Sequence, residues 1–209
     1  MNERLYRRVR RAGLNIRHCG EIGVYLPETS MVRGFIRDGV RTDLFEPDPE
    51  ALVKIREAFG SLPHVHIHPI AIHRDSGRIR LYRAGASTFA TDLKVSPALA
   101  NDNYRPSASQ SFEVEARRFS EVDDGTFDLL SIDTEGCEWY VLCHLVSRPL
   151  VISIETGWKR YVNPFLGDIR RWMEREGYRL WYRDGSDSVF LRRNISLGLL
   201  RRWSDRIVW

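Results

Sequence analysis

Several features that mark common classes of protein are missing from this sequence. The 209 residues include only three cysteines, and no two of them form a C-x-x-C pair. This spacing argues against a cysteine zinc site and suits a reducing compartment, so we expect a cytoplasmic protein. No apolar run reaches the roughly 18 residues that a membrane span needs, and the basic N-terminus lacks the apolar stretch of a signal peptide.

The motifs that bind polyphosphates are absent as well. There is no G-x-x-x-x-G-K-[ST] sequence, and no G-x-G-x-x-G follows the first predicted strand. Lysine occurs only at positions 54, 94 and 159, so the net charge of +4 rests on arginine. That charge favours a nucleic-acid methyltransferase, but acidic residues are interspersed along most of the chain and an N-P-P-Y base-methylation motif is lacking. We therefore expect no nucleic-acid partner.

The order of the apolar runs predicts an α/β fold. Strands are predicted at residues 18–25, 42–45, 65–72, 78–82, 112–119, 127–132 and 150–154, and helices at 29–39, 49–59, 137–146 and 164–176. Most strands alternate with helices, which is typical of a doubly wound, mostly parallel sheet with ligand sites at the carboxyl ends of its strands. Asp184-Gly185 lies between apolar runs at 178–182 and 188–191 and predicts a C-terminal antiparallel hairpin.

The chain is long enough for one domain with a sizeable core. We divide it into a basic N-terminal extension (1–17), the main domain (18–193) and a basic, amphipathic C-terminal tail (194–209), whose last residues are predicted to be helical. Residues 84–111 are polar and without periodicity, which is long for a loop and indicates a lid or substrate-binding insert. The tail is compatible with peripheral contact to an anionic membrane surface and with a homodimer contact, and the sequence favours neither.

Acidic residues follow the predicted strands at the edge where ligands bind. They are Glu21, Glu46, Asp133 with Glu135, and Glu155. Carboxylates there suit a cationic or hydroxyl-rich ligand better than a polyphosphate. Glu46, at the tip of the second strand, can accept hydrogen bonds from both ribose hydroxyls of an adenosine cofactor. The alternative for Glu46 is an N-cap of the next helix or a surface charge before it.

Asp133 and Glu135 form a second group in the sequence SIDTEGCEW. They come directly after a buried strand, where charged groups need a reason to be present. Either can orient a cofactor or substrate, or act as general base for a substrate hydroxyl, and Gly136 lets the backbone pass close to a ligand. The alternative is that both carboxylates cap the following helix. Glu138, one turn later, is compatible with either role.

Several ordered motifs resemble the FkbM family of methyltransferases. They are LFEPDPEAL (44–52), PIAI (69–72), STF (87–89), FDLLSIDTEGCEWYVL (127–142) and VISIET (151–156). The resemblance covers roughly residues 20–192. It implies a class I, Rossmann-like methyltransferase fold, S-adenosylmethionine (SAM) as methyl donor, and O-methylation, often of a sugar hydroxyl.

The resemblance also implies roles for individual residues. By position, Glu46 matches the carboxylate that binds the ribose, and Asp133 matches the acidic residue that faces the methyl-transfer site. Cofactor contacts are expected from Glu21, Gly23, Ser30, Glu46, Pro47, Ala71 and Asp133. The acceptor, a small molecule or glycan, is expected to contact Ser87, Thr88, Phe89, Glu155 and Trp158, and Asp133 or Glu135 to take its hydroxyl proton.

The first motif departs from the family pattern. The family usually has a D-x-G-A-N-x-G-type loop after the first strand, whereas this chain has EIGVYLPETS (21–30). One acidic residue and one glycine remain. Either the loop is a variant that still binds the methionine part of SAM through Glu21, Gly23 and Ser30, or SAM binding is weakened or lost. The second case makes the chain a non-catalytic Rossmann-like binding module.

Three histidines alternate at positions 64, 66 and 68, so a strand would place them on one face. Three imidazoles can bind zinc, but no carboxylate or cysteine lies nearby in the sequence. We expect no metal site, and we expect these histidines to face solvent beside the buried Val65 and Ile67.

Overall fold

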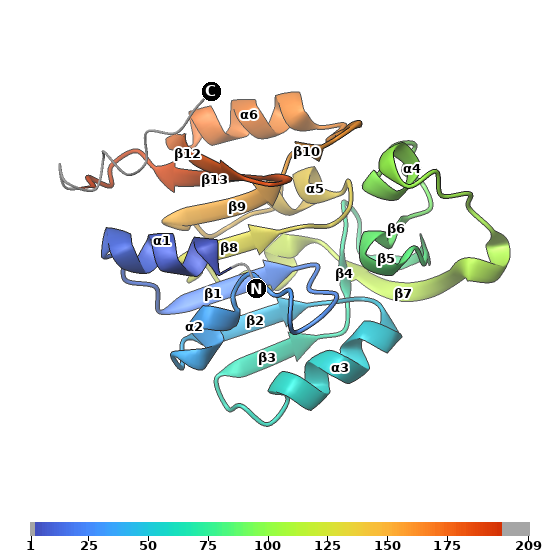
Figure 1. Cartoon of the computed structure of the whole chain (residues 1–209), viewed down its shortest axis with the longest axis horizontal. Helices are drawn as coiled ribbons and strands as arrows, with labels where there is room; N and C mark the ends of the chain where they lie inside the picture. The colour runs from blue at the N-terminus through green and yellow to red at the C-terminus, as the bar shows by residue number, and fades with distance from the viewer. Residues whose placement is uncertain (1–2, 198–209) are drawn as a thin grey trace.

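The computed structural model describes residues 3–197 of the chain (Figure 1). Its main sheet has seven strands in the order β12-β13-β9-β8-β1-β2-β3. The parallel strands are β1 (His18–Ile22), β2 (Arg41–Phe45), β3 (Val65–His68), β8 (Leu129–Ile132) and β9 (Val151–Glu155). At one edge, β12 (Tyr178–Asp184) and β13 (Asp187–Arg192) form an antiparallel hairpin. The predicted doubly wound α/β architecture with a C-terminal hairpin is confirmed.

Helices cover both faces of this sheet. One layer contains α1 (Arg4–Ala12), α2 (Arg33–Arg37) and α3 (Pro49–Phe59), and the other contains α5 (Glu138–Leu142) and α6 (Leu166–Arg175). Successive residues of a strand point to opposite faces, so a strand between two helical layers needs apolar residues at every position. Leu129 packs with the first layer and Leu130 with the second. This packing explains the continuous apolar run that predicted β8.

Local chemistry sets the ends of the elements. α3 begins where the sequence predicts, because the Asp48 carboxylate accepts a hydrogen bond from the Glu50 N–H and Pro49 occupies the first turn. The strand predicted over residues 65–72 is instead divided into β3 and β4 (Ala71–Ile72). Pro69 lies between them, and proline has no N–H to donate to a strand ladder.

A second, smaller sheet lies beyond the carboxyl ends of the main strands (Figure 1). It is formed by β4, β5 (Gly77–Tyr82), β6 (Phe89–Ala90) and β7 (Ser111–Arg117), in the order β4-β7-β5-β6. The segment 84–111, expected as an insert, supplies β6 and the short helix α4 (Pro97–Asn101). Asn101 joins α4 to the hairpin of β10 (Gly157–Trp158) and β11 (Tyr161–Val162) through hydrogen bonds with three backbone groups.

The two ends of the chain differ in what the structure describes. Within the expected N-terminal extension, α1 packs on the main sheet through Leu5 and Val9, which are fully buried. Most of the expected C-terminal tail, residues 198–209, lies outside the described residues. Among residues 3–197, no helix is long and apolar enough to cross a membrane.

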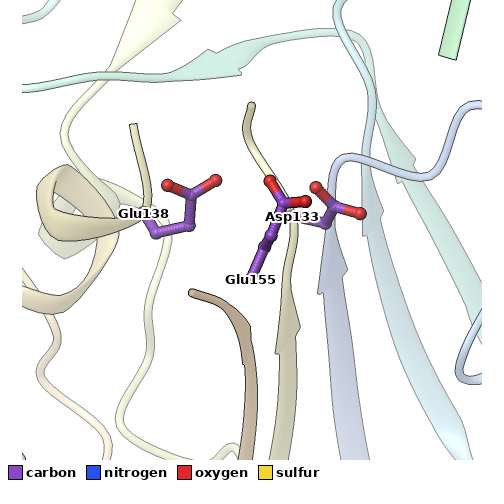
Figure 2. Close-up of side chains that lie close together, drawn as sticks. All are labelled: Asp133, Glu138 and Glu155. Carbon is purple, nitrogen blue, oxygen red and sulfur yellow. The ribbon is translucent and has the colours of Figure 1, made fainter. Parts of the chain in front are cut away.

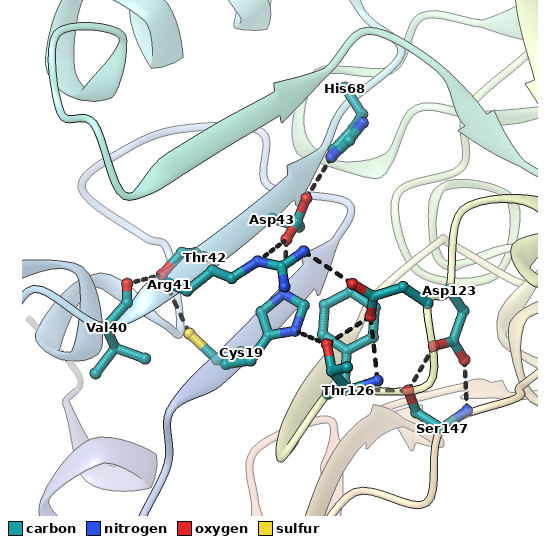
Figure 3. A network of polar contacts seen from close by, with 12 residues as sticks. Cys19, Val40, Arg41, Thr42, Asp43, His68, Asp123, Thr126 and Ser147 are labelled. Atoms are coloured by element: carbon teal, nitrogen blue, oxygen red, sulfur yellow. Dashed lines mark hydrogen bonds and ion pairs between the residues drawn. The ribbon is translucent and has the colours of Figure 1, made fainter.

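A buried network of polar side chains joins β1, β2 and β3 (Figure 3). The Asp43 carboxylate contacts Nε2 of His18 at 2.6 Å through one oxygen and Nε2 of His68 at 2.6 Å through the other. Nδ1 of His18 lies 2.8 Å from the Thr126 hydroxyl. The expectation that His68 faces solvent is therefore wrong, because Asp43 on the neighbouring strand draws it inward; His66 is exposed as expected.

Two opposing effects act on the Asp43 carboxyl. Burial favours its neutral form, but the hydrogen bonds from His18 and His68 outweigh burial and hold the pKa of Asp43 well below its usual range. A carboxylate whose pKa is lowered by folding stabilises the folded state above its unfolded pKa of about 4. That contribution is lost as the pH falls from about 4 towards the folded value.

We expect Asp43→Asn to lower the free energy of unfolding at pH 7 by about 3 kcal/mol, because the charged partner of the buried His18 and the half-buried His68 is removed. Denaturant unfolding of both proteins between pH 2 and pH 7 measures the effect. The difference from wild type should shrink below about pH 4, and Asp102→Asn, at an exposed position, should change stability little. A difference that stays constant down to pH 2 would contradict this role.

Candidate active site

A cavity of about 490 Å³ opens between the carboxyl edge of the main sheet and the smaller sheet. Its wall includes residues that follow β1, β2 and β8, and residues of β4, β5 and β6. This volume lies within the range of small-molecule and cofactor sites. The sequence predicted the ligand site at this same edge of the sheet.

The charged groups in the cavity wall are of one sign. Its carboxylates are Glu21, Glu46, Asp48, Asp133, Glu135, Asp184 and Asp187, and no lysine or arginine of residues 3–197 is among the lining residues. Carboxylates accept hydrogen bonds and attract cations, whereas they repel phosphates. The wall therefore fits a ligand that carries positive charge or hydroxyl groups.

Glu46 holds the loop that follows β1. One oxygen of its buried carboxylate accepts hydrogen bonds from the backbone N–H of Val24 (3.1 Å) and Tyr25 (2.8 Å), and the other accepts from Asp48 N–H (2.8 Å). The cap of α3 is Asp48, so the helix-capping alternative does not apply to Glu46 itself. A carboxylate can accept about four hydrogen bonds. Glu46 thus keeps roughly one acceptor position for a ligand hydroxyl.

Glu21 holds the next part of the same loop. Its carboxylate accepts hydrogen bonds from the Ser30 hydroxyl (2.5 Å) and from Met31 N–H (2.8 Å). No side chain of the described residues caps α2, which begins only at Arg33, four residues after the start of the helix predicted over residues 29–39. Burial raises the pKa of Glu21 to about 7, while the hydrogen bond from Ser30 opposes this shift.

Three carboxylates meet at the ends of β8 and β9 and at the start of α5 (Figure 2). One oxygen each of Asp133, Glu138 and Glu155 lies within 4.8 Å of the other two. Glu138 accepts hydrogen bonds from Thr134 N–H (2.9 Å) and Gly136 N–H (3.0 Å), and its other oxygen accepts from the side-chain amide of Asn163. Glu138, rather than Asp133 or Glu135, therefore holds the turn that leads into α5.

Glu135 has an unusual backbone conformation. Its φ of 57° lies in the left-handed region, which residues with side chains seldom adopt, and the next residue, Gly136, has φ of 115°. Oε2 of Glu135 is shielded from solvent and has no hydrogen-bond partner. Such strain costs on the order of 1–3 kcal/mol and is concentrated at functional sites. It marks Glu135 as a residue held in place by its surroundings.

Burial raises the pKa of the unpaired carboxyls at this edge, and their mutual repulsion raises it further. The pKa of Glu155 is raised to about 11 by burial and by the charges of Asp133 and Glu135. Burial raises the pKa of Asp133 well above its usual range, and the charge of Asp187 raises it further. No cation within the described chain pairs with these groups, so a ligand that brings positive charge would be stabilised here.

A family model described as the methyltransferase FkbM domain matches residues 13–180, which is most of the chain. The chain belongs to the FkbM methyltransferase family. The resemblance drawn from the motifs is thereby confirmed, together with the class I, Rossmann-like fold. This FkbM protein is a methyltransferase, and its cofactor is SAM.

Solved structures resemble this FkbM protein at low sequence identity. The methyltransferase domain of bacterial CtHen1-CN has a TM-score of 0.47 at 13% identity, over 90% of this chain and 97% of that chain. A TehB-like SAM-dependent methyltransferase from Corynebacterium glutamicum has a TM-score of 0.44 at 12% identity, over 88% and 85%. Ribosomal protein L11 methylase from Lactobacillus delbrueckii has 0.43 at 10%, over 90% and 76%. No curated protein matches the chain in sequence.

The residues of the FkbM site fit SAM in charge. SAM carries a sulfonium cation. The cavity wall contains several carboxylates, and no lysine or arginine of the described residues lines it. Gly23 passes so close to β8 that a Cβ atom there would lie 1.8 Å from the Asp133 carbonyl oxygen. The glycine that remains of the first motif therefore keeps the loops after β1 and β8 in contact at the cavity wall.

The structure brings most of the predicted site residues to this cavity. Its wall includes Glu21, Gly23, Glu46, Pro47, Ala71, Thr88, Phe89, Asp133 and Glu135. Ser30 does not line the cavity but donates a hydrogen bond to Glu21, which does. Glu155 does not line it either, but its carboxylate lies close to that of Asp133. Ser87 is not in the wall, and Trp158 lies on β10 with 52% of its surface exposed.

Asp187 and His73 are among the wall residues that were not predicted from the sequence. Asp187 starts β13, and an antiparallel strand brings its first residue, not its last, to the edge where the parallel strands end. The Asp184-Gly185 turn signal could have located it. His73 follows β4 and is buried with neither ring nitrogen hydrogen-bonded. Its position depends on how β4 joins the smaller sheet, which no local pattern indicates.

We expect Gly23→Ala to destabilise the protein by more than about 3 kcal/mol and to abolish SAM binding, because the new methyl group collides with the backbone of Asp133. Gly39→Ala is the matched control: Gly39 has φ of 77°, close to the 85° of Gly23, but no atom within 4 Å of a Cβ. It should cost only the roughly 1–2 kcal/mol of the left-handed backbone. If urea unfolding showed that both variants lose the same free energy of unfolding, the collision at residue 23 would be contradicted.

Proposed function

We propose that this chain is an O-methyltransferase that transfers the methyl group of SAM to a hydroxyl of a sugar or glycoconjugate intermediate. One observation carries the proposal: the charged side chains of the cavity wall are carboxylates, with no lysine or arginine of the described chain among the lining residues. Such a wall suits a cationic methyl donor and a neutral, hydroxyl-rich acceptor. It disfavours acceptors that present bare phosphates.

SAM supplies an electrophilic methyl group when bound, so the residues of the chain mainly position the reactants and exclude water. Glu46 keeps one acceptor position for a ribose hydroxyl while it holds the loop after β1. Asp133 and Glu135 stand in the cavity wall, where either carboxylate can accept the proton of the acceptor hydroxyl. Burial and mutual repulsion raise the pKa of both groups, which strengthens each as a proton acceptor when ionised.

The acceptor side of the cavity is the smaller sheet. Thr88 and Phe89 come from the 84–111 segment and line the cavity wall. An aromatic ring beside carboxylates combines an apolar contact for the face of a sugar ring with acceptors for its hydroxyls. These features support a sugar as the acceptor class.

A binding module without catalysis is the second candidate. The observation that favours it is that Glu46 already accepts three backbone hydrogen bonds, which leaves little capacity for a ribose. The altered loop after β1 points in the same direction. Titration with the cofactor separates the two candidates.

We expect SAM and S-adenosylhomocysteine to bind the purified protein with micromolar Kd, and Glu46→Ala to raise both Kd values by roughly 10–100-fold, the equivalent of one lost charged hydrogen bond. Isothermal titration calorimetry measures both. Glu57→Ala, at an exposed position on α3, should bind as wild type does. No binding by folded wild-type protein would favour the binding module, and unchanged Kd values in Glu46→Ala would remove the ribose role.

We expect Glu135→Gln or Asp133→Asn to lower kcat by roughly 10²–10⁴-fold, because an amide cannot take the hydroxyl proton. The formation of S-adenosylhomocysteine with a panel of glycan acceptors is the readout, and the Kd of SAM for each variant is measured alongside. The substitution that removes the general base should lower kcat and leave the Kd of SAM unchanged. Full activity in both variants would show that neither carboxylate is the base.

A further inference from the structure

The carboxylates of Asp133, Glu138 and Glu155 lack any compensating cation within residues 3–197. Glu155 is only 5% exposed, and no residue donates a hydrogen bond to its carboxylate. In Figure 2 its side chain rises between those of Glu138 and Asp133. A buried charge of this kind is costly unless it is paired, protonated or bound to a metal.

Unsatisfied polar atoms are concentrated around these carboxylates. Of the nine buried side-chain polar atoms without a partner in the described chain, five belong to Asp133, Thr134, Glu135, Glu155 and Tyr161. Native proteins leave few such atoms, so a concentration of them indicates a missing ion, water or ligand. Two of these atoms, the hydroxyls of Thr134 and Tyr161, can both donate and accept, and the Tyr161 side chain is only 1% exposed.

We propose that Asp133, Glu138 and Glu155 bind a hard divalent cation, such as Mg²⁺, Mn²⁺ or Ca²⁺, behind the wall of the cavity. All three ligands are carboxylate oxygens, with no imidazole or thiolate, which selects against zinc and copper. Asn163 and the N–H groups of Thr134 and Gly136 orient the Glu138 carboxylate, as outer partners do in metal sites. Tyr161 is placed to hydrogen-bond a water on the cation.

The spacing of the ligands fits such an ion. The three oxygens lie within 4.8 Å of one another. Oxygens on opposite sides of Ca²⁺ are about 4.6–5.2 Å apart, and those around Mg²⁺ about 4.0–4.2 Å apart. All three oxygens can therefore reach one cation of either size after shifts of less than about 1 Å.

The cation would also bind the hydroxyl of the acceptor, and this role rests on the proposed methyl transfer. Asp133 belongs both to the cluster and to the cavity wall, so the remaining coordination positions are next to the acceptor space. A hydroxyl bound there is oriented and made more acidic by the cation. With Asp133 committed to the cation, Glu135 is the carboxylate left to take the hydroxyl proton.

The test measures metal and SAM binding separately on the full-length protein. Mn²⁺ is titrated into chelator-treated wild type, Glu155→Gln and the surface control Glu57→Gln, and free Mn²⁺ is followed by electron paramagnetic resonance. Wild type and Glu57→Gln should bind one Mn²⁺ per chain in a saturable manner, and Glu155→Gln should raise the Kd at least about tenfold. Mg²⁺ or Ca²⁺ should displace the Mn²⁺. Asp133→Asn, which also removes one ligand, is used if Glu155→Gln does not fold.

Thermal unfolding gives a second readout. A cation that binds only the folded state should raise the Tm of wild type by about 5 °C or more at a hundredfold excess over its Kd, and should not shift Glu155→Gln. No saturable binding by folded wild type, or equal binding by Glu155→Gln, overturns the metal site. Calorimetry with SAM on the same samples keeps this result apart from the proposed function: SAM binding without Mn²⁺ binding removes only the cation.

Discussion

The loops at the ligand edge of this protein depend on one interaction, a buried carboxylate that accepts hydrogen bonds from backbone N–H groups. Glu46 holds the loop after β1 in this way, Glu21 holds the approach to α2, and Glu138 holds the turn after β8. Away from this edge, Asp123 accepts the N–H group of Ser147 in the same manner (Figure 3), and also that of Val146. An acidic side chain that accepts strong, charge-assisted hydrogen bonds can order an irregular segment whose backbone N–H groups have no partners in a helix or sheet.

This constraint divides the acidic residues into two groups. Glu21, Glu46 and Glu138 accept hydrogen bonds from the chain itself, so most of their acceptor capacity shapes the loops; Glu46 keeps a position for a ribose hydroxyl, and Glu138 keeps one for the proposed cation. Asp133 and Glu155 have buried oxygens without partners, so they remain available to a ligand. A cavity wall built this way needs external positive charge, which a sulfonium cofactor and a metal cation can both supply. The rigidity of the first group keeps the second group close together against its own repulsion.

The sequence predicted what depends on periodicity and missed what depends on contacts between distant segments. The apolar run around Leu130 and the Asp48-Pro49 start of α3 follow from local rules, and both are found in the structure. Which carboxylate binds a given N–H is decided by distance in space: no side chain of residues 3–197 caps α5, and Glu138, rather than Asp133 or Glu135, holds the turn before it. The inward turn of His68 was missed for the same reason, since its partner Asp43 lies on the next strand.

The altered first motif can be understood from the same interaction. A glycine-rich loop brings its backbone close to a ligand because it has no side chains in the way. Here Gly23 alone provides the close approach, and Tyr25 adopts φ of 56° with its N–H bound to Glu46. The carboxylate thus enforces a left-handed conformation that a glycine would adopt at no cost. The loop has exchanged glycines for a side chain that holds it in place, so the loss of the motif does not by itself mean the loss of the site.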